Sequence, residues 1–292
     1  MEKQNSQYYQ YGVAETVKRY RTKLHINTYI FVLFAVAELV WILIHGVHDF
    51  GALCREYLFI ICLLAIYQVT YYAHFPRLTQ ILMTDCDPYK FYEVLSRLDK
   101  YDRRGKAKNT LLFYKAVCCF YMNEHTEEGL SYLKSIHFKK KVLPREAKVL
   151  LLFSSYARLK DDRESFDLVK KDLESLPQII SHRKMQKKEY DETYMFFQEE
   201  ELIWDGEHEK AYKLINELLS RKISMLNRVS LNMHLARLDI KMNEKVNAKI
   251  HLEYVVEHGN TMSIVEEAKE LLDRQFYIDR QKNLEEKDAD NI

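Results

Sequence analysis

The sequence contains an apolar stretch long enough to cross a lipid bilayer. Residues 30–44 (IFVLFAVAELVWILI) comprise fourteen apolar side chains and one carboxylate, Glu38. The surrounding segment 26–47 has no Lys, Arg or Asp, and a helix of this length spans a hydrocarbon layer of about 30 Å. A second run, residues 57–75, carries no formal charge. We therefore expect a transmembrane helical hairpin over residues 26–76, with spans at about 26–47 and 57–75.

Two other interpretations of the first run are weaker. A cleavable signal peptide would have a shorter apolar core, no central glutamate and a small-x-small site after it. A pair of core helices in a large soluble domain would accommodate Gln68 and Thr70 in the second run. A soluble domain of amphipathic helices, however, has no need of two helices that are apolar on every face.

The distribution of Lys and Arg around the two runs predicts the orientation of the hairpin. The N-terminal tail, residues 1–25, is basic, whereas the connecting segment 48–56 has only Arg55, and Arg77 follows the second run. Basic flanks stay on the inner side of a membrane. We expect an integral protein of the cell membrane with both its N- and C-termini on the cytoplasmic side.

Glu38 requires an explanation if the first run lies in lipid, because a buried carboxylate there is costly. Asn27, Phe31, Glu38 and His45 fall on one stripe at helical spacing, which predicts a polar seam facing another helix. In a tight hairpin Gln68 would lie level with Glu38 and could hydrogen bond to it. A contact between two copies of the chain, or a proton-coupled or partner-sensing role, is the alternative.

The composition predicts an all-α protein without catalytic or metal-binding motifs. Only seven glycines and four prolines occur in 292 residues, too few for a turn-rich β fold. The five cysteines have no CxxC or zinc-ligand spacing, and the adjacent Cys118 and Cys119 are interpreted as small core residues. No phosphate-binding loop, HExxH or GxSxG motif is present, so we expect no enzyme activity, metal or cofactor. The acidic runs Glu199–Glu201 and Glu266–Glu267 are interpreted as solvated helix faces.

A repeating helix pair follows the hairpin. Four segments share one plan, in which an apolar helix, a short polar turn and a second helix with a small residue in its first turn succeed one another. The small residues are Gly129, Ser165, Ala211 and Ala248, separated by 36, 46 and 37 positions. This pattern predicts a stack of antiparallel helix pairs, with residues 89–98 capping one end and residues 263–273 capping the far end.

The repeats resemble the tetratricopeptide repeat family over roughly residues 109–272. The aromatic residue that the family has nine positions before the small one is matched by Phe120 and Tyr156, whereas the third and fourth repeats have Leu202 and Asp239. The Gly or Ala expected twelve positions earlier is matched by Ala236 alone; the other repeats have Val117, Phe153 and Glu199.

The resemblance implies an α-solenoid over residues 77–273 that binds a peptide or protein helix in a concave groove without catalysis. The first helix of each pair would line this groove, and the candidate groove residues are Tyr114, Tyr156, Tyr194 and Arg237. Residues 274–292 form a charged tail that we expect to be disordered.

The turns within helix pairs and the loops between pairs differ in charge. The turns within pairs are acidic in three of the four repeats, whereas the loops between pairs are basic. These loops would form a basic edge through Arg103, Arg104, Lys139, Lys140, Lys141, Arg183, Lys184, Lys187 and Lys188. Such loops are often simply solvated, but at an inner leaflet they would be attracted to anionic lipid. An acidic protein is a second partner for this edge, and a nucleic-acid partner is not expected at a net charge of +1 without a binding motif.

These features together predict a membrane-anchored scaffold or adaptor whose cytosolic repeat domain binds a protein or peptide. A membrane-tethered regulator that responds to a peptide, or a subunit of a transporter or enzyme complex that uses Glu38, is the alternative. A homo-oligomer is compatible with either.

Overall fold

The computed structural model of the chain describes residues 5–46, 50–102, 105, 107–123, 125–137, 142–180 and 184–274, apart from the side chains of residues 52, 53 and 185. Helices α1 to α12 and a last helical segment over residues 264–274 make up most of these ranges, in which no strand occurs. The all-α prediction is confirmed for this part of the chain. Contacts divide the chain into two units, Met1–Ile81 and Leu82–Ile292, which we call the hairpin unit and the helical unit.

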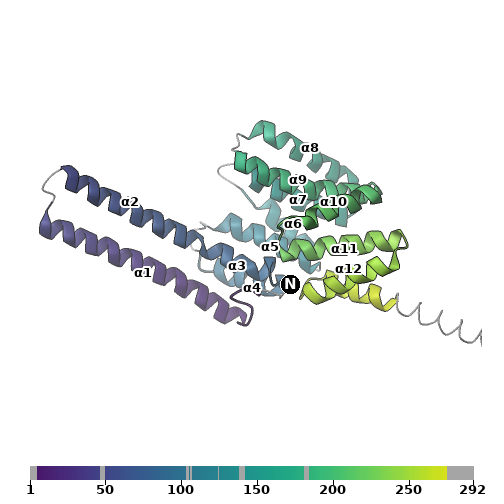
Figure 1. The fold of residues 1–292 in the computed structure, drawn as a ribbon, viewed down its shortest axis with the longest axis horizontal. Helices are drawn as coiled ribbons and strands as arrows, with labels where there is room; N and C mark the ends of the chain where they lie inside the picture. The colour runs from purple at the N-terminus through teal and green to yellow at the C-terminus, as the bar shows by residue number, and fades with distance from the viewer. Residues whose placement is uncertain are drawn as a thin grey trace, which may run out of the picture. The chain divides into compact units, whose positions relative to one another are not determined.

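The hairpin unit contains two long helices that pack side by side, α1 (Val13–His45) and α2 (Phe50–Tyr72), and most of α3 (His74–Met83) (Figure 1). Both long helices are long and apolar enough to cross a membrane. Gly46, whose φ of 65° is in the left-handed region, ends α1, and its N–H donates to the Ile42 carbonyl at 2.9 Å.

The turn of the hairpin is shorter than the sequence predicted. The segment 48–56 was expected to connect the spans, but α2 already begins at Phe50. Residues 50–56 contain one glycine and no proline, so nothing stops them from extending the helix. The earlier start of α2 shifts the register between the two helices, with consequences for Glu38 described below.

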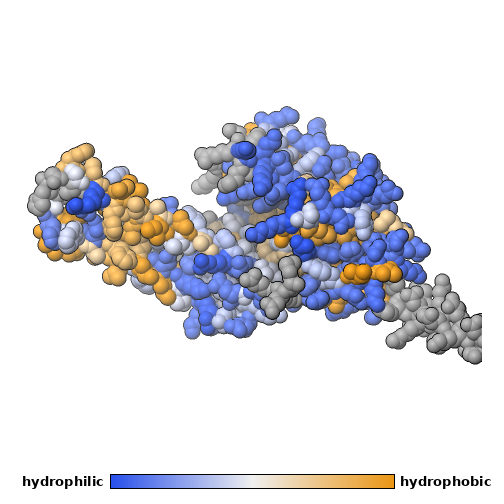
Figure 2. All heavy atoms as spheres, in the orientation of Figure 1, coloured by the Kyte–Doolittle hydropathy of each residue, from blue (hydrophilic) through white to orange (hydrophobic). Residues whose placement is uncertain are grey.

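Large apolar side chains cover the outside of the hairpin (Figure 2). Leu33, Leu43, Phe50 and Val69 are between 69% and 79% exposed, and few apolar residues of residues 26–72 are buried. A contiguous exposed apolar surface of this kind marks a membrane or protein interaction site.

The helical unit is built mainly from pairs of consecutive helices in contact. The first helix is α4 (Pro88–Asp99), which begins as predicted: Asp87 caps it by accepting a hydrogen bond from the Lys90 N–H, and Pro88 follows. The pairs are α5 (Lys108–Met122) with α6 (Thr126–Lys134), α7 (Leu143–Leu159) with α8 (Arg163–Ile179), α9 (Lys184–Trp204) with α10 (His208–Ser220), and α11 (Met225–Lys241) with α12 (Lys245–His258).

One turn geometry recurs within the pairs. A residue with positive φ ends the first helix each time: Asn123 at 59°, Asp161 at 55°, Gly206 at 74° and Asn243 at 62°. In the last three pairs, the N–H of the residue that follows the positive-φ residue donates to the carbonyl five residues before it. The three N···O distances are 2.9, 2.9 and 2.8 Å, and this arrangement is the Schellman motif. The three donors are Asp162, Glu207 and Glu244, and each is the N-cap residue of the second helix. The acidic character of these turns therefore has a local cause, since carboxylates stabilise helix N-termini.

The fourth residue of each second helix packs against its partner, and it is small in three pairs. Gly129, Ala211 and Ala248 are buried at this position. In the α7/α8 pair Ser165 lies in the first turn of α8, as predicted, but the buried fourth position is held by Phe166. Ser165 instead donates its N–H to the N-cap carboxylate of Asp162 at 3.0 Å.

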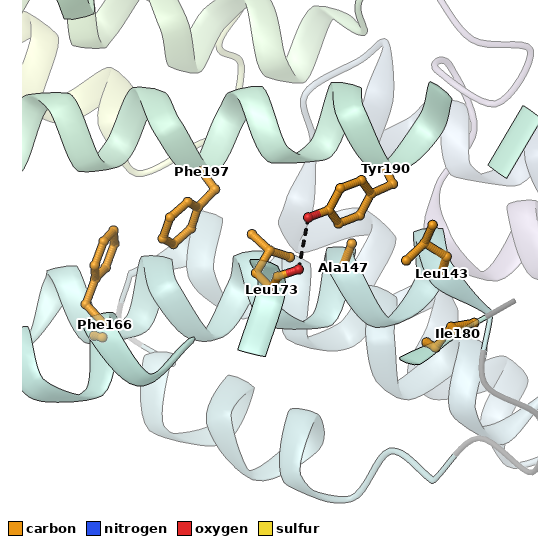
Figure 3. Close-up of a cluster of buried hydrophobic side chains, with 8 residues drawn as sticks. Leu143, Ala147, Phe166, Leu173, Ile180, Tyr190 and Phe197 are labelled. Atoms are coloured by element: carbon orange, nitrogen blue, oxygen red, sulfur yellow. Dashed lines mark hydrogen bonds between the residues drawn. The ribbon is translucent and has the colours of Figure 1, made fainter. Parts of the chain in front are cut away.

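Phe166 belongs to a core shared by α7, α8 and α9 (Figure 3). Its ring stacks on Phe197 with centroids 4.9 Å apart, and Trp204 meets it edge-on at 4.8 Å. The buried Tyr190 satisfies its hydroxyl by donating to the Leu173 carbonyl at 2.9 Å. Aromatic side chains of α9 thus complete the core of the α7/α8 pair.

The end of the helical unit contacts its beginning. Asn260 donates to the Asp85 carbonyl at 2.8 Å, Thr261 to the Asp87 carboxylate at 2.8 Å, and the Ser263 N–H to the Tyr121 carbonyl at 2.9 Å. The expectation that residues 263–273 form the end farthest from residues 89–98 is therefore wrong. The four pairs curve enough for the last segment to reach the first helices, which encloses the interior of the unit.

Candidate functional site

The interior of the helical unit contains a cavity of about 380 Å³. Its walls come from the first helix of all four pairs, α5, α7, α9 and α11, and from the last helical segment. The prediction that first helices line a groove agrees with this arrangement. Apolar side chains make up much of the wall: Phe120, Leu151, Leu152, Leu159, Phe196, Leu231, Met233 and Ile264.

Two adjacent carboxyl groups of α9 are buried in the wall of the cavity. Glu199 is 2% exposed and Glu200 is 8% exposed. Glu200 accepts hydrogen bonds from the hydroxyls of Ser154 at 3.1 Å and Ser155 at 2.7 Å, both on α7. Burial raises the pKa of Glu200, and the Arg158 guanidinium, 3.9 Å away, opposes that rise. The interpretation of residues 199–201 as a solvated face is wrong for these two glutamates.

His234 connects Glu199 to Arg158. Its Nδ1 lies 2.6 Å from Glu199 Oε1, and its Nε2 lies 3.5 Å from Arg158 Nη2. A guanidinium can only donate, so Nε2 is the accepting nitrogen and the proton resides on Nδ1, where it is donated to Glu199. This arrangement fits a neutral His234 that holds α11 against α9.

A bidentate ion pair lies at the exposed part of the cavity. Arg237 donates Nε and Nη2 to the two carboxylate oxygens of Glu267 at 2.9 and 2.6 Å. Both side chains are about 40% exposed, at 39% and 43%. A neighbouring cavity of about 280 Å³ is also lined by Arg158, His234, Arg237 and Glu267. These four side chains therefore stand between two hollows.

Tyr121 adds a neutral polar group on the α5 side of the cavity. Its hydroxyl is hydrogen bonded to Ser230 of α11. Burial raises the pKa of Tyr121 to about 12, so the phenol stays protonated at neutral pH. The cavity consequently has one strongly polar side, on α7, α9 and α11, and a largely apolar remainder.

Of the four candidate groove residues, only Arg237 lines the cavity. Tyr114 packs edge-on against Phe91 of α4 with ring centroids 5.9 Å apart. Tyr156 donates its hydroxyl to the Glu127 carboxylate at 3.0 Å, on the α6 side of α7. Tyr194 donates to Glu174 of α8 at 3.1 Å and joins the α7–α9 core. The three tyrosines are on the predicted helices but face neighbouring helices, because the helical rotation was not determined by the sequence.

The sequence did contain a signal for the buried acids. Glu199 occupies the position, twelve residues before the small Ala211, where the resemblance implies a small interior residue. An ionisable residue at an interior position indicates either a buried functional group or a changed packing. The composition of residues 199–201 alone does not distinguish buried from exposed acids, whereas the position of Glu199 in the repeat does.

The hairpin places Glu38 against a different partner from the one predicted. Its carboxyl hydrogen bonds with that of Glu56, to which Arg55 also donates at 3.2 Å. Gln68 is exposed and lies about three helical turns from Glu56 along α2, as a consequence of the earlier start of this helix.

The predicted polar seam is present over part of its length. Thr70 of α2 donates to Asn27 at 3.0 Å, and Phe31 packs against Tyr67 with ring centroids 4.5 Å apart. His45, by contrast, is exposed and stacks on Trp41 of its own helix at 3.8 Å, so its place in the seam is wrong.

The structure describes only part of the predicted basic edge. Lys184, Lys187 and Lys188 are exposed in the first turns of α9. Arg103, Arg104, Lys139, Lys140, Lys141 and Arg183 lie outside the described residues, as does nearly all of the predicted tail over residues 274–292.

Among the described residues, no group of three or more His, Cys, Asp or Glu side chains could hold a metal ion. All five cysteines are free, and burial raises the pKa of the Cys119 thiol to about 12 and that of Cys118 well above its usual value. Both thiols are thus protonated core groups.

No family model, curated protein or solved structure matches the chain.

Proposed function

We propose that the protein is a membrane-anchored adaptor that binds a short segment of a protein or peptide in the cavity of its helical unit. The observation that carries this proposal is the cavity itself, with four successive first helices around it and buried, hydrogen-bonded acids in its wall. Folded interiors are normally close-packed, and an apolar pocket with a few convergent polar groups is typical of a binding site.

The helical unit is interpreted as a curved array of tetratricopeptide-like pairs. The turn that recurs at Asn123, Asp161, Gly206 and Asn243 supports this interpretation, as does the recurrent small residue at Gly129, Ala211 and Ala248. The contact of the last segment with the first helices restricts the space inside. A short extended or helical segment suits such a cavity better than a whole domain does. A ligand of this size is also compatible with the alternative function, a regulator that responds to a peptide.

The apolar hairpin is the proposed anchor. Its exposed apolar surface would be covered by lipid, and its polar seam would be shielded between the two helices. The basic flanks place both termini, and with them the helical unit, on the inner side of the cell membrane. Anionic lipid at that surface is the proposed partner of the basic edge.

Site-specific photocrosslinking in cells tests the binding proposal. A benzoylphenylalanine at Leu159, which lines the cavity and is 52% exposed, should give a discrete crosslinked species. The matched control is Leu168 on α8, 59% exposed but not in the cavity wall, which should give none. Ser230→Trp, which fills the cavity, should abolish the Leu159 adduct. Equal adducts from both positions, or a Leu159 adduct that survives Ser230→Trp, would contradict the proposal.

Cysteine labelling tests the anchor and its orientation. In a Cys54→Ser, Cys62→Ser background, Phe50→Cys near the hairpin turn should react with an impermeant maleimide from outside intact cells. Glu164→Cys in the helical unit should react only after permeabilisation. The remaining cysteines, Cys86, Cys118 and Cys119, are buried and give a low background. Reaction of Glu164→Cys in intact cells would refute the orientation.

A further inference from the structure

The ionisable groups in the cavity wall do not balance one another. Three carboxyl groups, those of Glu199, Glu200 and Glu267, stand in the wall against two guanidinium groups, those of Arg158 and Arg237. The excess of carboxyl groups is not distributed evenly over the cavity wall. Arg237 and Glu267 form their own bidentate pair near the exposed part, and they neutralise each other there.

The imbalance therefore falls on the two buried carboxyl groups of the cavity wall, those of Glu199 and Glu200. In the part of the chain that the structure describes, the guanidinium beside these two acids is that of Arg158, and it lies 3.9 Å from Glu200. Their direct hydrogen-bond donors are neutral, the hydroxyls of Ser154 and Ser155 and the imidazole of His234. Buried charges are ordinarily paired with an opposite charge, because taking an ion out of water is costly.

We propose that the segment bound in the cavity carries a basic side chain, Lys or Arg, that pairs with Glu199 and Glu200, with apolar residues on either side of it. This inference rests on the proposed function and adds the chemistry of the occupant. The cation restores the charge balance at the buried acids, and its apolar neighbours contact the surrounding wall. Phe120, Phe196 and Met233 provide apolar surface of the kind that packs against such residues.

An acidic segment fits the same cavity less well, despite the two arginines. Arg237 is already bound by Glu267 through two hydrogen bonds, so an acidic ligand would have to displace that carboxylate. It would also have to enter beside Glu199 and Glu200, where like charges repel at low dielectric. Charge complementarity therefore selects a cation.

The test uses the full chain in nanodiscs of zwitterionic phosphatidylcholine. The probes are three pools of nine-residue peptides, acetylated and amidated at their ends, random in apolar and neutral polar residues except at the centre. The central residue is Arg, Gln or Glu. Peptides retained by the immobilised protein are quantified by mass spectrometry after subtraction of empty nanodiscs. We expect at least a tenfold enrichment of the Arg pool over the Gln pool, and depletion of the Glu pool.

The double variant Glu199→Gln, Glu200→Gln is the decisive comparison. The amide at position 199 keeps an oxygen that can accept from His234. At position 200 the amide oxygen can accept from one of the two serine hydroxyls and the amide NH2 can donate to the oxygen of the other, while both charges are lost. The enrichment of the Arg pool should disappear, whereas retention of the Gln pool should not fall. Glu266→Gln, an exposed acid outside the cavity wall, should leave the enrichment unchanged. If circular dichroism shows the double variant unfolded, Glu200→Gln alone takes its place and should reduce the enrichment at least threefold.

The outcomes separate this inference from the proposed function. Equal retention of all three pools, abolished by Ser230→Trp, would leave peptide binding intact and overturn the selection of a cation. Higher retention of the Glu pool than of the Arg pool would likewise leave peptide binding intact and overturn the selection of a cation. Retention of no pool above empty nanodiscs would overturn both. Enrichment of the Arg pool that persists in the double variant would show that the acids are not the site of selection.

Discussion

His234 Nδ1 lies 2.6 Å from Glu199 Oε1, although the two residues are on different helix pairs, 35 positions apart in the chain. The hydrogen bond satisfies a buried carboxyl that would otherwise lack a donor, and it fixes the rotation of α11 relative to α9. Because Ser154 and Ser155 of α7 hold Glu200 in the same way, the polar side of the cavity is assembled before any ligand arrives. Such preorganisation lowers the entropic cost of binding.

Replacement of Glu200 by Gln should stabilise the protein. Burial raises the pKa of Glu200, so its ionised form at neutral pH is disfavoured in the folded state. The isosteric amide can accept from one serine hydroxyl and donate to the oxygen of the other, and we expect the free energy of unfolding at pH 7 to rise by about 1 kcal/mol. Denaturant unfolding of the full chain in detergent, followed by circular dichroism, measures this. Glu266→Gln should change it by less than about 0.5 kcal/mol, and a destabilised Glu200→Gln would mean that the charge is well compensated.

Asp239 should make stability fall as the pH rises through about 6. It is 1% exposed, neither carboxylate oxygen accepts a hydrogen bond from the described residues, and its closest cationic candidate, His251 Nε2, lies 3.7 Å away. Burial, with a further contribution from Glu244, raises the pKa of Asp239 to about 6. Burial also lowers the pKa of His251, which favours its neutral form.

The folded Asp239 carboxyl thus holds its proton more tightly than the unfolded chain does. Its contribution is complete below pH about 4 and lost as the pH rises past about 6, a change of up to about 3 kcal/mol. Asp239→Asn should flatten this slope in unfolding curves recorded between pH 4 and 8 and stabilise the protein at pH 8. The control Glu253→Gln, an exposed acid on α12, should keep the slope. An unchanged slope in Asp239→Asn would assign the pH dependence to other groups.

Two glycines should respond to alanine for different reasons. A Cβ at Gly259 would lie 2.4 Å from Val265 Cγ2 and 2.7 Å from the Val255 carbonyl oxygen, with an ordinary φ of −76°. A Cβ at Gly206 would meet nothing within 4 Å, but the residue has a φ of 74°. We expect Gly259→Ala to cost about 2 to 3 kcal/mol through overpacking and Gly206→Ala about 1 kcal/mol through backbone strain.

The same denaturant titrations distinguish the two glycine effects. Asn at position 206 tolerates the left-handed region, so Gly206→Asn should recover most of the loss, whereas Gly259→Asn should be at least as damaging as Gly259→Ala. If Gly206→Ala proved the more costly, the close packing of residues 259–265 would be wrong.

The thermal stability of the hairpin should depend on Glu56 and not on Gln68. Glu56→Leu removes the hydrogen-bond partner of Glu38, whose Oε1 already lacks one among the described residues. Leaving a polar group unpaired in an apolar environment costs about 1 to 2 kcal/mol. The protein solubilised in detergent should therefore aggregate at a lower temperature, as monitored by size exclusion after heating. Gln68→Leu, at an exposed position, should not lower it, and the opposite ranking would restore the predicted Glu38–Gln68 contact.

The local chemistry of the chain determined its helices and much of their order. The apolar runs specify two long helices, and Asp87 with Pro88 specifies the start of α4. The recurring turns are also local, since Asn, Asp and Gly tolerate positive φ and an acid then caps the next helix. These features depend on neighbours within a few residues, which is why the sequence is sufficient to predict them.

Only the tertiary structure decided which side of each helix faces the interior. A rotation of about 100° separates one residue from the next along a helix. Tyr156 therefore faces α6 while Ser155 faces the cavity, and no local property distinguishes the two outcomes. The same applies to the hairpin, where a few residues of turn decided between Gln68 and Glu56. The contact between Asn260 and Asp85, 175 positions apart, depends on how all the helix pairs between them pack on one another. The same packing creates the cavity, and no local stretch of sequence specifies it.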